Sequence, residues 1–107
     1  MNSTALVFLK APRPGLVKTR LAREVGEQAA TEIYRTLAGE QWRRIPGNWR
    51  AEVHFTPHDA ETEMRAWLGE RGIFRPQGEG DLGARLATGF AAAFRAGASP
   101  VIALGGD

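Results

Sequence analysis

The 107-residue sequence contains no cysteine, only two lysines and no long apolar run. The lack of cysteine excludes disulfide bonds, thiolate metal sites and a cysteine nucleophile, and it fits a reducing compartment. The longest apolar run near the N-terminus, Ala5 to Leu9, is too short for the apolar region of a signal peptide or for a membrane span. We therefore expect a cytoplasmic protein with no membrane span.

Acidic residues are absent from the first 23 positions, which hold five of the basic residues. The five are Lys10, Arg13, Lys18, Arg20 and Arg23. Because the whole chain has 14 Lys and Arg against 12 Asp and Glu, the remainder has 9 against 12 and is acidic. The excess positive charge thus belongs to one segment. Aromatic residues do not alternate with these bases and no nucleic-acid recognition motif is present, so we expect no nucleic-acid partner.

Short apolar segments alternate with amphipathic segments along the chain. The apolar run at 5–9 is typical of a strand buried on both faces, and apolar residues repeating every three or four positions predict helices. We expect strands at 5–9, 51–56, 73–74 and 101–104, and helices at about 17–45, 59–68 and 82–94. This β-α-β-α-β-α-β order predicts one α/β domain over residues 1–107 with a parallel, Rossmann-like sheet. Such a sheet normally continues past its fourth strand, so we expect a truncated domain.

Four further expectations concern single residues or segments of these elements. The first helix is expected to restart after Gly26, and its second part carries an apolar stripe that includes Ile33 and Leu37. Asp59 is expected to cap the helix that follows it. His54 shares no metal-ligand spacing with a second residue, so we expect it to be hydrogen-bonded or exposed rather than a ligand.

Open parallel sheets bind ligands at the carboxyl ends of their strands, where three loops should meet in this chain. These loops are residues 10–18, 77–82 and 105–107.

The first of these loops combines stiff backbone with positive charge. Pro12 and Pro14 restrict the backbone, and Gly15 allows close approach of a ligand. The amides and dipole of the following helix favour an anion at its start. The cations that would surround a diphosphate are Lys10, Arg13, Lys18 and Arg20. The alternative is a solvated basic turn without a ligand, since the spacing matches neither a Walker loop nor a GxGxxG fingerprint.

The second loop is rich in glycine and leads into a helix. Its candidate nucleotide-binding residues are Gln77, Gly78, Gly80, Asp81, Leu82 and Gly83. Gln77 and exposed backbone amides would contact the edge of a base, while Gly80 and Gly83 would leave room for a ring. Asp81 is equally well explained as the N-cap of the helix, and the two roles are compatible.

The third segment ends in Asp107, directly after an apolar strand. Carboxylates in this position commonly hold a divalent metal against a diphosphate. Because Mg²⁺ takes oxygen ligands and keeps several waters, one or two carboxylates are sufficient. The alternative is a frayed chain end with no ligand.

The segments Lys10–Leu21, Gln77–Leu86 and Val101–Asp107 together resemble three successive signatures of one bacterial family. This is the glycosyltransferase-A-like family also described as radical-SAM/selenodomain-associated transferase 1. It is related to the nucleotide-diphospho-sugar transferases and, more distantly, to the guanylyltransferases of phospholactate and of molybdenum cofactor. The resemblance spans the whole chain.

The resemblance implies the N-terminal half of a nucleotide-diphospho-sugar transferase-like fold, with a nucleotide at the sheet edge. The loop from Arg13 to Arg20 would hold its phosphates, the segment Gln77–Gly83 would approach the nucleoside, and Asp107 would take part in a Mg²⁺ or Mn²⁺ site. In the family, the last motif continues into roughly another half-domain that supplies acceptor binding and further metal ligands. We expect that part to be missing here.

The leading functional hypothesis is the nucleotide-binding part of a metal-dependent transferase that uses a nucleoside diphosphate sugar. Lys18 and Arg20, with the metal, would stabilise charge on the departing diphosphate. One alternative is nucleotidyl transfer from a nucleoside triphosphate to a small phosphorylated acceptor, as in the guanylyltransferases. Another is a non-catalytic remnant that binds a nucleotide. The exposed edge of the last strand leaves a homo-oligomer open.

Overall fold

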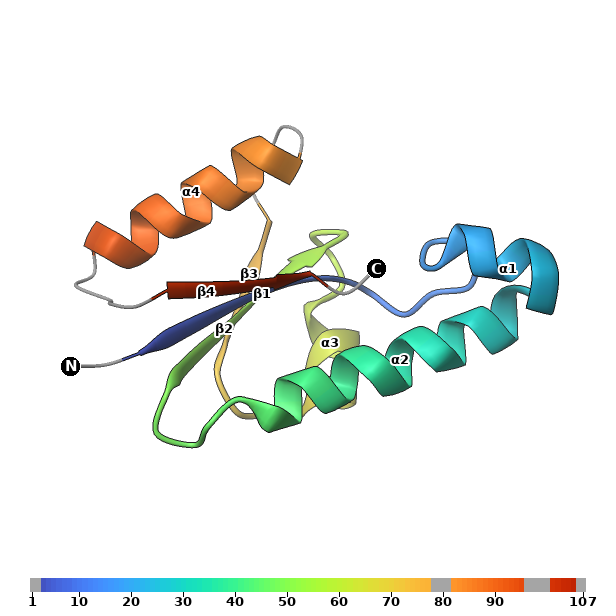
Figure 1. Ribbon diagram of the computed structural model, residues 1–107, viewed down its shortest axis with the longest axis horizontal. Coiled ribbons are helices and arrows are strands. Elements are labelled where there is room, and N and C mark those ends of the chain that lie inside the picture. Colours follow the sequence, from blue (N-terminus) through green and yellow to red (C-terminus); the bar gives the residue numbers. More distant parts are fainter. Residues whose placement is uncertain (1–2, 78–81, 96–100, 106–107) are drawn as a thin grey trace.

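The computed structural model describes residues 3–77, 82–95 and 101–105, in which strands and helices alternate (Figure 1). The order confirms the predicted β-α-β-α-β-α-β pattern, and the first helix is divided at Gly26 as expected. Among the helices described, none combines the length and the apolarity that crossing a membrane requires. The elements are β1 (Thr4–Lys10), α1 (Thr19–Val25), α2 (Glu27–Arg44), β2 (Arg50–Thr56), α3 (Glu61–Leu68), β3 (Ile73–Pro76), α4 (Leu82–Arg95) and β4 (Val101–Gly105).

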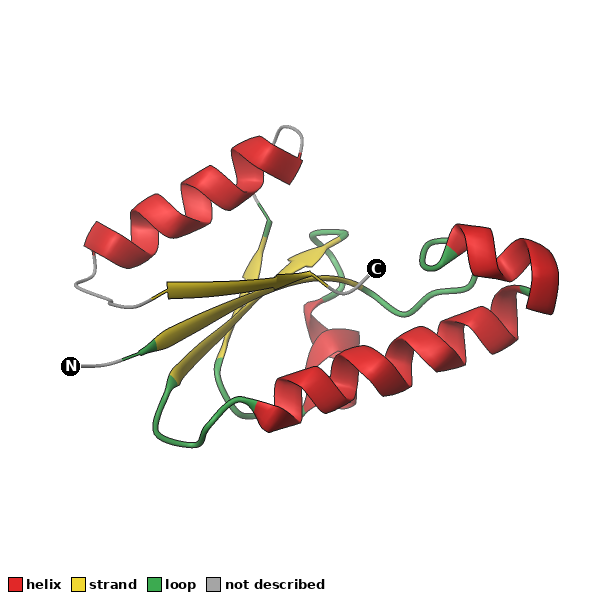
Figure 2. Ribbon diagram, in the orientation of Figure 1, coloured by secondary structure: helices red, strands yellow, loops and turns green. Residues whose placement is uncertain are grey.

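The four strands form one parallel sheet in the order β3-β2-β1-β4, which confirms the Rossmann-like class. In the register, Val7 of β1 lies opposite Val53 of β2 and Leu104 of β4. Helices α2 and α3 cover one face of the sheet and α4 covers the other (Figures 1 and 2). Because parallel strands need crossover connections, this three-layer arrangement follows from the alternating element order.

The main core lies between the sheet and the pair α2 and α3. Alternate residues of the strands, such as Val7, Leu9 and Val53, meet Tyr34 and Trp42 of α2, and all five side chains are fully buried. Burial of one such Val or Leu side chain is worth about 1.5–3 kcal/mol. This face therefore supplies most of the apolar stabilisation in the described part of the chain.

The opposite face of β1 meets α4 at close range. A Cβ atom placed on Gly89 would lie 2.9 Å from Cζ of Phe8, closer than real Cβ contacts allow. The ring of Phe8 also stacks on His54 of β2, with ring centroids 4.8 Å apart. The absence of a side chain at Gly89 thus lets α4 lie directly on these two rings.

Two expectations for the helices are wrong. Ile33 and Leu37 belong to the predicted apolar stripe, yet they are 39% and 51% exposed. Each is followed in the sequence by a buried residue, Tyr34 or Ala38, and successive residues of a helix lie about 100° apart around its axis. Asp59 does not cap α3: the N-cap residue is Ala60, and no side chain bonds to the cap. The carboxylate of Asp59 instead lies 3.6 Å from Nη2 of Arg13.

Candidate functional site

The carboxyl ends of the four strands lie at one edge of the sheet, beyond which α1 and the start of α2 project (Figure 1). The chain passes from β1 to α2 on one face and reaches β4 from α4 on the other face. The strand order therefore reverses at β1, and ligands of open α/β sheets bind at this kind of switch point. The basic loop 11–18 leaves the sheet there.

Backbone hydrogen bonds fix the loop as it leaves β1. The amide of Ala11 donates to the carbonyl of Thr56 at 2.8 Å, and Leu16 donates to the carbonyl of Arg13 at 3.0 Å. Gly15 has a φ of +85°, which residues with side chains rarely adopt, and the close approach of a ligand there stays a prediction. Pro12 is buried beneath the loop. The loop is thus a defined turn with a rigid base.

Lys18 has the left-handed backbone conformation, with φ 51° and ψ 45°, and is the N-cap residue of α1. For a residue with a Cβ atom, this conformation costs on the order of 1–3 kcal/mol. Arg20 follows in the first turn of α1 and is exposed, while Lys10 and Lys18 are partly exposed. The three cations therefore come from the strand end, the loop end and the helix start. Their contact with phosphate stays a prediction.

Tyr34 of α2 holds the end of β1. Its hydroxyl group accepts a hydrogen bond from the amide of Lys10 at 2.8 Å and donates one to the carbonyl of the same residue at 2.9 Å. The sequence indicates Tyr34 only as a core residue of the helix, and no spacing signal links it to Lys10. It is a positioning residue that sequence reasoning missed.

Arg13 points to α3. Its Nε lies 3.1 Å from both carboxylate oxygens of Glu63, and Nη2 binds the same carboxylate. The hydrogen bonding of Arg13, which donates to Glu63, is the main cause that raises the pKa of Arg13, and the same interaction lowers the pKa of Glu63. A phosphate contact by Arg13 stays a prediction, and it would require the guanidinium to share or leave this carboxylate.

Gln77 follows β3, and its side-chain amide spans the sheet edge. Nε2 donates to the carbonyl of His54 at 2.9 Å and to that of Leu9 at 3.4 Å, while Oε1 accepts from Nη1 of Arg85 at 2.7 Å. Its backbone amide donates to the carbonyl of Phe55. Both ends of the amide thus contact protein, and base recognition by Gln77 stays a prediction.

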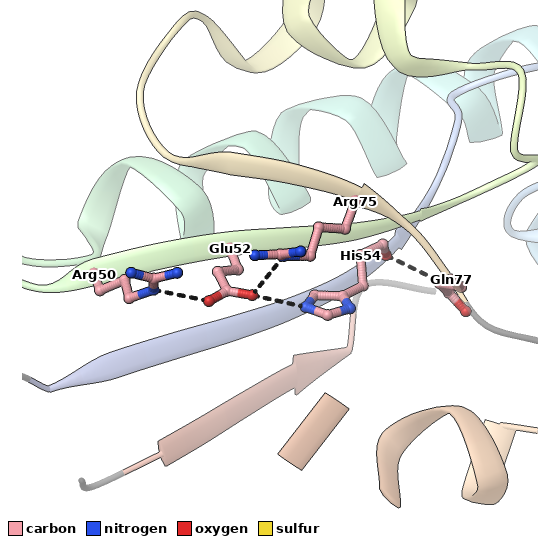
Figure 3. A network of polar contacts seen from close by, with 5 residues as sticks. All are labelled: Arg50, Glu52, His54, Arg75 and Gln77. Carbon is pink, nitrogen blue, oxygen red and sulfur yellow. Dashed lines mark hydrogen bonds and ion pairs between the residues drawn. The ribbon is translucent and has the colours of Figure 1, made fainter. Parts of the chain in front are cut away.

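A polar network follows one face of β2 and β3 toward this edge (Figure 3). The carboxylate of Glu52 lies 2.9 Å from Nε of Arg50, 3.2 Å from Nε2 of His54 and 3.4 Å from Nε of Arg75. Glu52 and His54 are buried, whereas the two arginines remain about half exposed. Of the two alternatives expected for His54, hydrogen-bonded or exposed, the structure confirms the first.

Burial and neighbouring charges together set the protonation states of Glu52 and His54. Burial of Glu52 raises its pKa, but the hydrogen bonds from Arg50 and His54 and the charges of Arg50 and Arg75 outweigh burial, so the net pKa is lowered. Burial lowers the pKa of His54, and the hydrogen bond and charge of Glu52 only partly offset this. At neutral pH the centre is therefore an ionised carboxylate beside a neutral imidazole.

Several predicted site residues lie outside the described part of the chain. Leu82 and Gly83 are placed, as the first two residues of α4. Within residues 3–77, 82–95 and 101–105, no group of three His, Cys, Asp or Glu residues is arranged to hold a metal ion. The Mg²⁺ or Mn²⁺ site stays a prediction. The predicted residues outside the described ranges are Gly78, Gly80, Asp81 and Asp107.

Comparison with protein-family models matches residues 43–107 to the family described as "Uncharacterized protein conserved in bacteria (DUF2064)". The chain belongs to the DUF2064 family. The match contains β2, α3, β3, α4 and β4, and therefore the polar network and Gln77. Among curated proteins, none matches this DUF2064 chain.

A solved structure is similar to this chain over its whole length. It is a crystal structure from Desulfovibrio desulfuricans G20, described as a "putative nucleotide-diphospho-sugar transferase". The sequences are 32% identical, the TM-score is 0.86, and the alignment covers 100% of this chain and 48% of the relative. The DUF2064 chain thus spans about half the length of that relative and has the same fold.

Proposed function

We propose that the chain is the nucleotide-binding part of a metal-dependent transferase that uses a nucleoside diphosphate sugar. Within the DUF2064 family, we propose the radical-SAM/selenodomain-associated transferase 1 type. The observation that carries this proposal is the position of the basic loop, which leaves the sheet at the switch point beside β1. The similarity of the full chain to a structure described as a nucleotide-diphospho-sugar transferase supports the same class.

In this proposal the diphosphate lies over the loop that follows β1. Lys10 comes from the strand end, Lys18 from the loop end and Arg20 from the first turn of α1, so positive charge faces the phosphates from more than one side. Lys18 and Arg20 would stabilise the charge that develops on the leaving diphosphate. The end of β1, where the loop begins, is held by Tyr34, which limits the reorganisation needed on binding.

The metal belongs to the proposal as well. Asp107 follows β4, the neighbour of β1 on the other side of the switch point, and its carboxylate would be one oxygen ligand. A bound Mg²⁺ or Mn²⁺ would supply positive charge to the diphosphate oxygens.

Calorimetric titration with UDP, GDP and dTDP, each with and without Mn²⁺, tests the proposal. We expect one diphosphate to bind more tightly than the others and to bind better with Mn²⁺. Lack of binding by all three would contradict the proposal. Pyrophosphate release from a nucleoside triphosphate would instead indicate nucleotidyl transfer.

A further inference from the structure

Gln77 joins the ends of three neighbouring strands. It follows β3 directly, and its backbone amide donates to the carbonyl of Phe55 on β2 at 2.8 Å. Its side chain extends over β2, where Nε2 donates to the carbonyl of His54 at 2.9 Å and to that of Leu9 on β1 at 3.4 Å (Figure 3). Because β2 lies between β3 and β1 in the sheet, this one residue spans from the first strand of the three to the last.

The other end of the amide sets its orientation. Oε1 of Gln77 accepts a hydrogen bond from Nη1 of Arg85, in the first turn of α4, at 2.7 Å. A guanidinium can only donate, so the oxygen faces Arg85 and Nε2 faces the two carbonyls. The N–H groups of Nε2 therefore serve the main chain of β1 and β2. A base edge would have to displace one of these contacts, so the geometry favours a structural role over base recognition.

Two side chains hold successive residues at the end of β1. Gln77 binds the carbonyl of Leu9, and the hydroxyl group of Tyr34 binds the amide and the carbonyl of the next residue, Lys10. One of the two contacts comes from the residue after β3 and the other from α2. The end of β1 is thus fixed by elements that lie far from it in the sequence.

The basic loop 11–18 begins directly after these contacts. Ala11 donates to the carbonyl of Thr56, the last residue of β2, at 2.8 Å. That hydrogen bond joins the same two strands whose carbonyls Gln77 binds. The starting point of the loop therefore depends on the spacing of β1 and β2 at their carboxyl ends, which Gln77 spans.

We propose that Gln77 is a positioning residue for the phosphate-binding loop, holding the ends of β1 and β2 at the spacing from which residues 11–18 leave the sheet. This inference rests on the proposed function, in which that loop binds the diphosphate. A loop that is already held in place loses less entropy when it binds, so Gln77 raises affinity without touching the ligand. Its effect is the same for every phosphate ligand, whatever the base.

The first measurement is amide hydrogen exchange of the protein without ligand. Gln77→Met removes the contacts of the amide group and keeps an unbranched side chain, and Gln41→Met is the matched control at an exposed glutamine of α2. We expect Gln77→Met to speed exchange at the amide of Ala11 by about threefold to tenfold, because the hydrogen bonds that hold the strand ends are lost. The amide of Ala38 in α2 reports global opening and should exchange as before in both variants.

A second variant guards against a failure of Gln77→Met to fold. Gln77→Asn keeps an amide group, but its side chain is one methylene shorter and no longer reaches the carbonyl of Leu9 from the same backbone position. It should speed exchange at Ala11 in the same direction. Thermal unfolding of all the variants monitors the fold.

The second measurement is calorimetric titration with UDP, GDP, dTDP and inorganic pyrophosphate, each in the presence of Mn²⁺. We expect Gln77→Met to weaken the binding of all four ligands by a similar factor, about threefold to tenfold, because the affected loop contacts only phosphates. Gln41→Met should bind like the unaltered protein. Recognition of a base by Gln77 predicts the opposite pattern, with unequal losses for the three nucleotides and unchanged binding of pyrophosphate.

That opposite pattern would overturn the inference, and so would unchanged binding of all four ligands. Equal exchange at Ala11 in Gln77→Met, Gln77→Asn and Gln41→Met would overturn it whatever the protein binds. If the unaltered protein binds pyrophosphate and no nucleotide, the proposed function fails and the pyrophosphate comparison decides the inference. Binding of neither kind of ligand overturns both.

Discussion

The hydroxyl group of Tyr34 binds both the amide and the carbonyl of Lys10, at 2.8 and 2.9 Å. One buried side chain of α2 therefore satisfies two backbone groups at the point where β1 ends and the basic loop begins. The polypeptide would otherwise have to satisfy these groups with water or through the loop itself. The geometry of the loop thus depends on a residue 24 positions away in the sequence.

Tyr34→Phe is expected to lower the free energy of unfolding by about 1–3 kcal/mol, because two backbone groups lose their partner while packing is unchanged. Urea denaturation measures the difference. Thr31→Val is the matched control: it removes a hydroxyl of the same helix that binds only the carbonyl of Glu27 within α2. An equal loss in both variants would show that Tyr34 has no special role at the loop.

Glu63→Gln is expected to raise the affinity for a nucleoside diphosphate severalfold, because the carboxylate of Glu63 no longer competes with the phosphate for the guanidinium of Arg13. Calorimetric titration at low salt measures the change, since pairing between partly exposed charges is screened at high salt. Glu61→Gln on the same helix, which pairs with Arg65, should bind as before. A loss of affinity in Glu63→Gln would mean that the ion pair supports the loop instead.

Lys18→Gly is expected to separate stability from binding. Glycine adopts φ 51° without the steric cost that a lysine bears, so the variant should be as stable as the unaltered protein or more stable by up to about 1 kcal/mol. The same variant loses the ammonium group and should bind diphosphates about tenfold more weakly. Denaturation and titration of one preparation measure both effects. Lower stability together with unchanged binding would contradict the assignment.

Gly72→Ala is expected to destabilise the fold by roughly 2–4 kcal/mol. Gly72 has a φ of +90°, and an added Cβ would lie 2.8 Å from the carbonyl oxygen of Ala51 and from Cη2 of Trp42. Gly47→Ala is the control, because an added Cβ there meets no atom within 4 Å. Thermal unfolding of the two variants measures the contrast, and equal melting temperatures would be the contrary result.

Stability is expected to fall in two stages as the pH decreases. The pKa of His54 is lowered by burial, so the unfolded chain binds a proton first as the pH falls through about 6.5. The pKa of Glu52 is also lowered on balance, burial being outweighed by Arg50, His54 and Arg75, so a second loss begins as the pH falls through the ordinary range of glutamate. Both shifts therefore favour the folded state at neutral pH over acid.

Urea denaturation between pH 7.5 and 4 measures this dependence. His54→Gln should remove the first stage, whereas His58→Gln, at an exposed histidine, should leave the profile unchanged. A profile that keeps its first stage in His54→Gln would show that another group is responsible.

The sequence was sufficient to predict the order of the elements because each boundary has a local signal, such as Gly26 between α1 and α2. It was not sufficient to predict the partners of polar side chains. Glu63 is 50 residues from Arg13, and no periodicity links them. The alternation in β2 is the same whether Glu52 and His54 face water or lie buried beneath other side chains. Such contacts depend on tertiary packing rather than on local pattern.

The hydrogen bond between Gln77 and Leu9 joins residues 68 positions apart in the sequence. The two carbonyls that Gln77 binds come to adjacent positions only after β1 and β2 have paired. Contacts of this kind form late, because the entropy of closing a long loop must be offset first. We therefore expect the contacts of Gln77 to form only after β1 and β2 have paired, so that these contacts depend on the correct register of the two strands.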